Sequence, residues 1–431
     1  MNYQETTEYL FNSTPVFEKI GAKAYKEGLY NTHELDRHFD HPHKKFKTIH
    51  VAGTNGKGSC SHTLASILQH AGYKVGLYTS PHLIDFRERI KINGKCISEK
   101  YVVEFVENER GFFEKLHPSF FELTTAMAFK YFADNNVDIA VIEVGLGGRL
   151  DCTNIINPII SVITNISFDH TQFLGSTLPL IAGEKAGIIK KKTPVVIGED
   201  IPLTRPVFEQ KAKLCESEIT FAGDTNKIIS ATHNNNTGIV YKTTDYGTIT
   251  SELYGDYQQR NANTILHVAD ILLRIGVLKD KACVVQGFAD VCDTTGLMGR
   301  WQKLQDKPLI VCDTGHNVGG WQYLSKQIKR QHCQTLRIVF GMVDDKDIEH
   351  VMQLLPPNAV YYFTRANTHR AIPEDVVRQR ALKHGLKGLS YSNVADAYRH
   401  AIKEANTNDF IFIGGSSYIV ADLLAILEKH N

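Results

Sequence analysis

The chain has 431 residues, a length typical of two or three domains. Hydrophobic residues make up 42% and charged residues 22%, an ordinary globular composition that excludes a disordered or fibrous protein. Lys and Arg together number 48 against 47 Asp and Glu, so the net charge is +1. This balance provides no overall positive field that would attract nucleic acid or an anionic membrane, and we expect neither as a partner.

The eight cysteines are scattered and form no C-x-x-C pair, which is typical of reduced thiols in the cytoplasm. Residues 1–10 are polar and acidic, without the basic and apolar regions of a signal peptide. No uninterrupted apolar run approaches the roughly 18 residues of a membrane span. We therefore expect a cytoplasmic protein.

From Thr48 onward, short β-branched runs alternate with longer helical patterns such as that of residues 123–135. This alternation is typical of βαβ units and predicts an α/β fold with a mostly parallel sheet. The predicted strands of this first series are 48–52, 75–79, 139–144, 159–163 and 195–197.

Residues 218–254 are polar and rich in Thr and Asn, with turn signals that predict a small antiparallel appendage. Helices follow at 261–275 and near Ala282, and residues 294–299 have the composition of a linker. A second βα series then begins, with predicted strands at 309–312, 336–340, 359–363 and 410–413. The sequence therefore predicts an N-terminal domain of residues 1–296 and a smaller C-terminal α/β domain of residues 297–431.

A glycine-rich loop, residues 53–59, lies between the first strand and a helix, where backbone N–H groups and the helix dipole attract phosphate. Lys57 adds a positive charge to this loop. The match to G-x-x-x-x-G-K-[ST] is imperfect, because Gly58 occupies the hydroxyl position and Ser59 follows one residue late. The departure disfavours a generic kinase or GTPase. The alternative is a glycine-rich turn with a solvated lysine.

Glu143 ends an apolar strand and needs a compensating charge. The ligand crevice of an open parallel sheet lies beyond the carboxyl ends of its strands, so Glu143 should face the same crevice as the glycine loop. A carboxylate there is a candidate ligand for Mg²⁺. The alternative is a structural ion pair with Arg149.

Two further segments lie near the same predicted edge. Asp169 and His170 follow the strand at 159–163 and are either metal ligands or a hydrogen-bonded loop pair. Lys185 is next to Glu184 on a helical pattern, and the sequence does not decide between a solvated neighbour and a site residue.

In the second domain, Asp313 follows a strand and is either a site residue or the cap of the next helix. Residues 414–417 form a glycine-rich turn that suits an anionic carboxylate or only a tight turn. His33, His38, His41 and His43 have no accompanying carboxylate or thiol pattern in the sequence, so we interpret them as solvated loop histidines.

Taken together, these motifs resemble the folylpolyglutamate synthase/dihydrofolate synthase family of Mur-type ligases. The resemblance covers essentially the whole chain and rests on residues 50–59, 78–83, 86–89, 143–154, 169–170, 184–188, 299–301 and 313–317. There are two departures from the family pattern. The usual Asp-x-Ala-His-Asn reads Asp-Thr-Gly-His-Asn at residues 313–317, and Cys152 replaces the usual Ala before Thr-Asn.

The resemblance implies a P-loop domain joined to a smaller Rossmann-like domain in a monomer. It implies an ATP-dependent ligase that adds L-glutamate to dihydropteroate, to the γ-carboxylate of reduced folates, or to both, through an acyl phosphate and with two Mg²⁺ ions. The alternative within the fold is a Mur-type ligase of peptidoglycan precursors. The alternative from another class is a P-loop protein that senses nucleotide without forming a bond.

The resemblance also implies a role for each matching residue. The implied catalytic residues are Lys57, Glu143, His170, Lys185 and His316. The nucleotide contacts Asn55, Gly56, Lys57, Gly58, Ser59, Asn261, Arg300 and Asp313. Magnesium is held by Ser80, Glu143, His170 and Lys185, the last as a carbamate. The substrates contact Ser119, Phe120, Phe121, Glu122, Leu150, Asp151, Cys152, His316 and Ser417.

Overall fold

A computed structural model describes residues 1–13, 28–234, 238–344 and 346–428. The chain divides into two compact units. The first comprises Met1–Glu252 and Gln258–Leu297, and the second comprises Leu253–Tyr257 and Met298–Asn431. Among the helices described in these ranges, none combines the length and apolar character needed to cross a bilayer.

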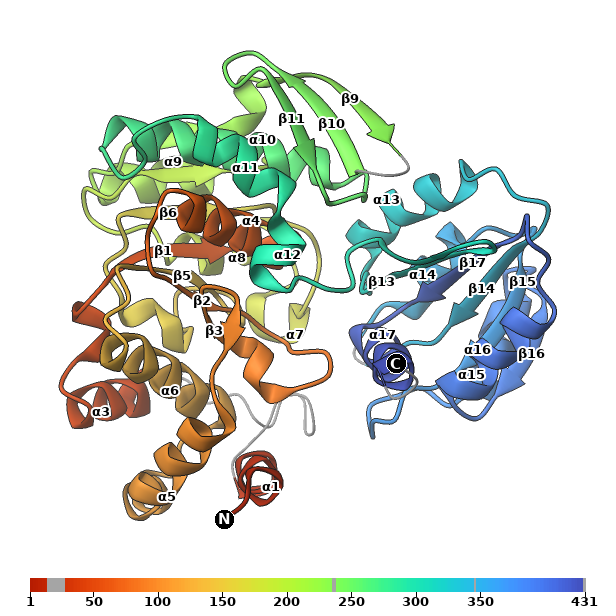
Figure 1. The fold of residues 1–431 in the computed structure, drawn as a ribbon, viewed down its shortest axis with the longest axis horizontal. Coiled ribbons are helices and arrows are strands. Elements are labelled where there is room, and N and C mark those ends of the chain that lie inside the picture. The colour runs from red at the N-terminus through yellow and green to blue at the C-terminus, as the bar shows by residue number, and fades with distance from the viewer. Residues whose placement is uncertain (14–27, 235–237, 345, 429–431) are drawn as a thin grey trace. The chain divides into compact units, whose positions relative to one another are not determined.

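The first unit is built on an eight-stranded sheet (Figure 1). In spatial order its strands are β4 (Lys95–Cys96), β3 (Ile90–Ile92), β2 (Val75–Tyr78), β5 (Ile139–Glu143), β1 (Lys47–Ala52), β6 (Ile160–Ile163), β7 (Val195–Ile197) and β8 (Ile219–Phe221). The six strands from β2 to β8 in this order are parallel, and β3 and β4 extend one edge as an antiparallel ribbon. The predicted mostly parallel α/β fold is confirmed.

Helices cover both faces of this sheet, because successive residues of a buried strand point to opposite faces. The α-helices of the first unit's described residues are α1 (Tyr3–Ser13), α3 (Tyr30–His38), α4 (Lys57–His70), α5 (Glu99–Leu116), α6 (Phe120–Asp134), α7 (Thr171–Leu174), α8 (Leu178–Ala186), α9 (Arg205–Leu214), α10 (Gln258–Arg274), α11 (Ala282–Ala289) and α12 (Val291–Thr295). Val141 packs in the cluster with α4, α10 and α11, whereas Ala140 and Ile142 pack in the cluster with α5 and α6. Short 3₁₀ turns lie at Pro42–Lys44, Phe86–Arg89, Cys152–Ile155 and Ala222–Asp224.

The second unit has a six-stranded sheet that is parallel except for one edge strand. Its order is β12 (Gln302–Asp306), β13 (Leu309–Asp313), β17 (Phe410–Gly414), β14 (Leu336–Phe340), β15 (Val360–Thr364) and β16 (Gly388–Tyr391). The helices are α13 (Val318–Lys329), α14 (Ile348–Leu354), α15 (Glu374–Lys383), α16 (Val394–Lys403) and α17 (Ser417–Glu428). Trp321 is fully buried in its core against Phe340 and Phe412.

The antiparallel appendage is smaller than the sequence predicted. It consists of β9 (Ile228–Asn234), β10 (Gly238–Thr243) and β11 (Thr248–Ser251). Residues 219–221, which precede the appendage, form β8. This strand pairs in parallel with β7 and therefore belongs to the main sheet. The difference arises because β8 has only three residues, too few to show a buried-strand pattern in sequence.

The prediction of solvated loop histidines is wrong in part, because His33 and His38 lie on α3 and the His43 side chain is only 8% exposed. His41 and His43 contact the two carboxylate oxygens of Asp36 at 2.6 and 2.5 Å. His38 lies on α3, where its ring stacks on Phe112 with centroids 3.9 Å apart. The contact of His38 with Phe112 could not be read from the local sequence because Phe112 lies on another helix, whereas Asp36 is only five residues before His41 and seven before His43.

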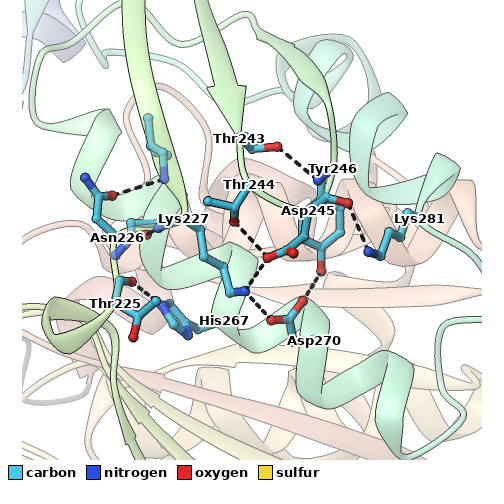
Figure 2. Close-up of polar contacts among 12 residues, drawn as sticks. Thr225, Asn226, Lys227, Thr243, Thr244, Asp245, Tyr246, His267, Asp270 and Lys281 are labelled. Carbon is cyan, nitrogen blue, oxygen red and sulfur yellow. Dashed lines mark hydrogen bonds and ion pairs between the residues drawn. The ribbon is translucent and has the colours of Figure 1, made fainter.

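A network of ion pairs and hydrogen bonds connects the appendage to α10 (Figure 2). Lys227 Nζ lies 2.9 Å from an Asp245 carboxylate oxygen and 2.6 Å from one of Asp270 on α10. Tyr246 Oη donates to Asp270 at 2.5 Å, and Lys281 Nζ donates to the Asp245 carbonyl at 2.9 Å. Burial lowers the pKa of Lys227, but the hydrogen bonds to Asp270 and Asp245 outweigh it and raise that pKa.

We expect Lys227→Met to reduce the free energy of unfolding by about 1 kcal/mol, because it leaves two carboxylates without their shared cation while both remain partly solvated. Urea unfolding at pH 7 measures the change, with Lys242→Met on an exposed position of β10 as the control. Equal losses in the two variants would show that the network contributes nothing.

Candidate active site

The glycine loop follows β1, which lies between β5 and β6 near the centre of the sheet. Gly53 has φ +148°, and a Cβ there would lie 1.8 Å from the Thr164 hydroxyl oxygen. Gly56 has φ +83°, and a Cβ there would lie 2.4 Å from Asn261 Oδ1. Both conformations and both close approaches require glycine. The loop therefore passes close to the end of β6 and to the first turn of α10.

The segment after β6 fixes the shape of this loop. Asn165 accepts from Thr54 N through its carbonyl at 3.0 Å and from Asn55 N through its side-chain oxygen at 2.9 Å. The Thr164 hydroxyl donates to the Asn55 carbonyl at 2.5 Å. Sequence analysis missed Thr164 and Asn165, because only the pairing of β1 with β6 brings them beside a loop about 110 residues earlier.

Two lysine side chains converge on the carbonyl of Gly53. Lys57 Nζ donates to the Gly53 and Thr54 carbonyls, each at 3.1 Å, and Lys185 Nζ donates to the Gly53 carbonyl at 2.9 Å. Lys185 is 4% exposed, so it is not a solvated neighbour of Glu184. Burial and then the charge of Lys57 lower the pKa of Lys185 to about 7. The arrangement holds concentrated positive charge at the start of α4 and suits an anion.

Glu143 lies at the end of β5, opposite Val51 in the pairing with β1, and is 3% exposed. The alternative interpretation paired it with Arg149. The Arg149 guanidinium contacts Glu184 Oε1 at 2.9 and 3.1 Å. A buried carboxylate therefore lies at the same sheet edge as the glycine loop, as the strand order predicts.

The loop after Glu143 is held by Asp151, whose carboxylate accepts from Leu146 N at 2.8 Å and from Thr153 N at 3.0 Å. Burial raises the pKa of Asp151. Leu150 and Cys152, on either side of it, are half-buried. Asp151 thus holds the backbone of this loop in place by accepting hydrogen bonds from its amides.

The other predicted substrate segment, residues 119–122, begins α6. Ser119 caps the helix by accepting from Glu122 N at 3.3 Å, and Glu122 accepts from Ser119 N at 2.6 Å. The Phe121 ring lies against Gly145, where a Cβ would be 2.4 Å from a ring carbon. Phe120 faces elsewhere, stacking on Phe11 with centroids 4.8 Å apart. The structure therefore brings the start of α6 next to the loop that follows Glu143.

The remaining predicted metal ligands lie in loops after parallel strands. His170 has φ +49° and directly precedes α7, and its Nε2 is 3.8 Å from Asp169 Oδ1. Ser80 follows β2 and is half-buried. Among the described residues, no three His, Cys, Asp or Glu side chains form a group that could hold a metal ion by themselves. A complete ligand set here would need Ser80, the modified Lys185 or ligand oxygens, and it stays a prediction.

In the second unit, Asp313 accepts three hydrogen bonds: from Tyr257 Oη at 2.6 Å, from Trp301 N at 2.7 Å and from Gly315 N at 2.8 Å. Burial raises the pKa of Asp313. It does not cap α13 as the alternative interpretation held. Asn317 does so by accepting from Gly320 N at 2.9 Å.

Arg300 and His316 both contact Thr314. The Arg300 guanidinium donates to the Thr314 hydroxyl, and His316 Nδ1 donates to the Thr314 carbonyl at 3.1 Å. Ser417 begins α17 and is half-buried, while its neighbour Ser416 accepts from Ile419 N at 3.2 Å. The structure thus brings Arg300, Asp313 and His316 together on one loop pair within the second unit.

Comparison with known proteins decides the family. Residues 51–269 match the Mur ligase middle domain and residues 299–417 match the Mur ligase glutamate ligase domain. A folylpolyglutamate synthase of Lacticaseibacillus casei is 33% identical over 98% of this chain and 97% of the relative. The chain belongs to the folylpolyglutamate synthase/dihydrofolate synthase family of Mur ligases. The resemblance noted in the sequence is confirmed.

Other members of this family resemble the chain over almost its whole length, in sequence and in structure. A dihydrofolate synthase/folylpolyglutamate synthase of Bacillus subtilis is 31% identical over 92% of this chain and 94% of the relative. The structure of Mycobacterium tuberculosis folylpolyglutamate synthase complexed with ADP has a TM-score of 0.87 at 28% identity, covering 99% of this chain and 98% of that one. E. coli FolC in complex with DHPP and ADP has a TM-score of 0.83 at 28% identity, covering 100% and 98%.

The buried Lys185 side chain should make the free energy of unfolding depend on pH. Its pKa is about 7 in the folded chain and about 10.4 when unfolded, so between these values the unfolded chain binds more protons. We expect the free energy of unfolding to rise with pH over this range, by at most about 1.4 kcal/mol per pH unit, relative to Lys185→Met.

Urea unfolding in CO₂-free buffer at pH 7, 8 and 9 measures this slope. Lys191→Met, at a lysine with a 74% exposed side chain, is the control and should keep the wild-type slope. Parallel pH dependence in wild type and Lys185→Met would contradict the prediction.

Proposed function

We propose that this chain is an ATP-dependent ligase that forms an amide between L-glutamate and a folate-type carboxylate, either that of dihydropteroate or the γ-carboxylate of a reduced folate. The observation that carries the proposal is the convergence of Lys57 and Lys185 on the Gly53 carbonyl at the start of α4, beside a buried strand-end carboxylate. The relatives' names support this substrate class, and E. coli FolC was crystallised with DHPP and ADP.

The chemistry requires an activated acid. A carboxylate is a poor acceptor for an amine, because its leaving group would be oxide, so ATP first converts it to an acyl phosphate. Phosphoryl transfer depends on positioning and on neutralising the charge of the phosphate oxygens. Lys57 and the first turn of α4 provide both. The neutral glutamate amine then attacks the acyl carbon to form the C–N bond, the C–O bond to phosphate breaks, inorganic phosphate leaves, and the nitrogen loses a proton.

The residues at the sheet edge fit a divalent metal. Glu143 is a buried carboxylate and Ser80 a hydroxyl, both oxygen donors of the kind Mg²⁺ prefers, and His170 adds a nitrogen. A Yersinia pestis relative was crystallised with AMPPNP and a Mn ion. When bound, Mg²⁺ would neutralise charge on the nucleotide phosphates. Two such ions, held with the help of Glu143, Ser80 and His170, form part of the proposal.

We assign Lys185 a carbamate in the active enzyme. A carbamate forms when a neutral amine attacks CO₂ and loses a proton. The pKa of about 7 provides that neutral amine near physiological pH. An ammonium would repel Mg²⁺, whereas the carbamate oxygens carry negative charge and would help to hold it.

For the substrates, we assign the pteridine and its aminobenzoate to the segments that meet at Phe121 and Gly145, namely residues 119–122 and 150–152. Asn55, Gly56, Gly58, Ser59 and Asn261 are assigned to ATP: Gly56, Gly58 and Ser59 to the triphosphate and Asn261 to adenine. In the second unit, Arg300 and Asp313 are assigned to the nucleotide, and His316 and Ser417 to glutamate. We also propose a cytoplasmic monomer.

A peptidoglycan-type ligase would share the ATP chemistry and differ in the acceptor, and the named relatives favour folate. A nucleotide sensor would bind ATP without forming a bond. One assay separates all three: ATP, Mg²⁺ and glutamate, as the L or the D enantiomer, are incubated with dihydropteroate, with tetrahydrofolate, with UDP-N-acetylmuramoyl-L-alanine or with no acceptor, and ADP and products are measured by mass.

We expect ADP release that depends on a folate-type acceptor, and Lys57→Ala should lower kcat at least a hundredfold while the protein stays folded, because it removes a phosphate-facing charge without opening a core cavity. Lys100→Ala, 82% exposed on α5, is the control. Wild-type turnover in folded Lys57→Ala would contradict the phosphate-loop assignment.

For Lys185, we expect Lys185→Ala to lose activity that acetate or formate partly restores, because a small carboxylate can replace the carbamate oxygens. Lys185→Arg should stay inactive although it keeps the positive charge. ¹³C NMR of wild type with ¹³C-bicarbonate measures the carbamate directly. Full activity in Lys185→Arg would remove the carbamate from the mechanism.

A further inference from the structure

Gln258, the first residue of α10, joins two parts of the candidate nucleotide site. Its side chain is 2% exposed. The amide nitrogen donates to Ser59 Oγ at 3.1 Å, and the amide oxygen accepts from Asn261 Nδ2 at 2.8 Å. Ser59 lies 199 residues away in sequence, in the first turn of α4. Nothing in the sequence motifs indicated this contact.

Asn261 continues the connection back to the glycine loop. Its side-chain oxygen lies where a Cβ on Gly56 would approach to 2.4 Å, and its Cγ lies 3.2 Å from the same point. The Asn261 amide therefore rests directly on the backbone of Gly56. Gly56 and Ser59 flank Lys57 and Gly58, so the Gln258–Asn261 pair contacts the phosphate turn at both ends.

The hydrogen-bond directions determine how Ser59 can act. A serine hydroxyl has one hydrogen to donate. Because Ser59 Oγ accepts from Gln258, its own hydrogen points away from that amide. At the N-terminus of α4, a hydroxyl in this orientation adds a donor for phosphate oxygens to those of the backbone. An acceptor in place of the Gln258 nitrogen would draw the hydroxyl hydrogen toward itself.

We propose that Gln258 is a positioning residue that couples the Asn261 amide to the orientation of the Ser59 hydroxyl, so that recognition of the nucleotide base strengthens the grip on its phosphates. The proposal rests on the proposed function, which assigns Asn261 to adenine and Ser59 to the triphosphate. It predicts an energetic connection between two residues that share no direct hydrogen bond in the structure, only Gln258 between them.

The test measures Kd by calorimetry for ATP and for inorganic tripolyphosphate, each with Mg²⁺, in wild type, Asn261→Ala, Gln258→Leu and the double variant. Tripolyphosphate has no base for Asn261 to contact. We expect Asn261→Ala to weaken tripolyphosphate binding about threefold in wild type and not at all in the Gln258→Leu background. We also expect Gln258→Leu alone to raise the Kd of ATP about tenfold, the effect of one or two lost hydrogen bonds.

Gln259→Leu is the matched control, since Gln259 is the next residue of the helix and only half-buried. It should leave both Kd values unchanged. A purely structural role for Gln258 would lower thermal stability without making the tripolyphosphate effect of Asn261→Ala depend on Gln258. Equal tripolyphosphate affinity in Asn261→Ala and wild type, or the same loss in both backgrounds, overturns the proposal.

If Gln258→Leu does not fold, Gln258→Glu carries the test. Its carboxylate would accept from Ser59, turn the hydroxyl hydrogen away from the phosphates and add negative charge, so both Kd values should rise more than tenfold. Unchanged values overturn the proposal. Acceptor-dependent ADP release by wild type is measured first and tests the proposed function alone, so failure of the Gln258 coupling in an active enzyme is distinguishable from failure of that function.

Discussion

The carbonyl oxygen of Gly53 accepts hydrogen bonds from two lysine ammonium groups, and the rest of the site follows from this arrangement. Burial first, and then repulsion between the two nearby cations, lower the pKa of Lys185. The repulsion is relieved when an anion enters or when one amine loses its proton. In the function that we propose, nucleotide phosphates provide the first route and a carbamate the second. The two lysines therefore organise the loop for negative charge.

This convergence depends on the parallel sheet. β1 lies between β5 and β6, so the ends of these strands bring Glu143, the glycine loop and Thr164 to one edge. Gly53 can approach Thr164 only because it has no Cβ. A larger residue would push the loop away from β6 and separate its carbonyl from Lys185. The glycines thus serve the packing of the loop on its neighbours as well as the approach of phosphate.

The secondary-structure elements that depend on a local residue pattern could be predicted from the sequence. Strands such as β7 and β14 have the predicted bounds, since runs of β-branched residues show buried strands directly. Strand β8 and the environment of Lys185 could not be predicted in this way. The former is too short for a pattern, and the latter depends on a contact across 132 residues. The same holds for Gln258, whose partner Ser59 becomes its neighbour only after the sheet and α10 have formed.

Asp313, which we assign to the nucleotide, also positions the residues next to it. Its carboxylate already accepts from Trp301 N, Gly315 N and Tyr257 Oη, which engages both oxygens. Trp301 adjoins Arg300 and Gly315 adjoins His316, and both of these side chains contact Thr314. Each backbone donor therefore fixes the position of a neighbouring cationic or titratable side chain. The geometry makes Asp313 a tether that holds Arg300 and His316 in place, in addition to the nucleotide contact that we propose for it.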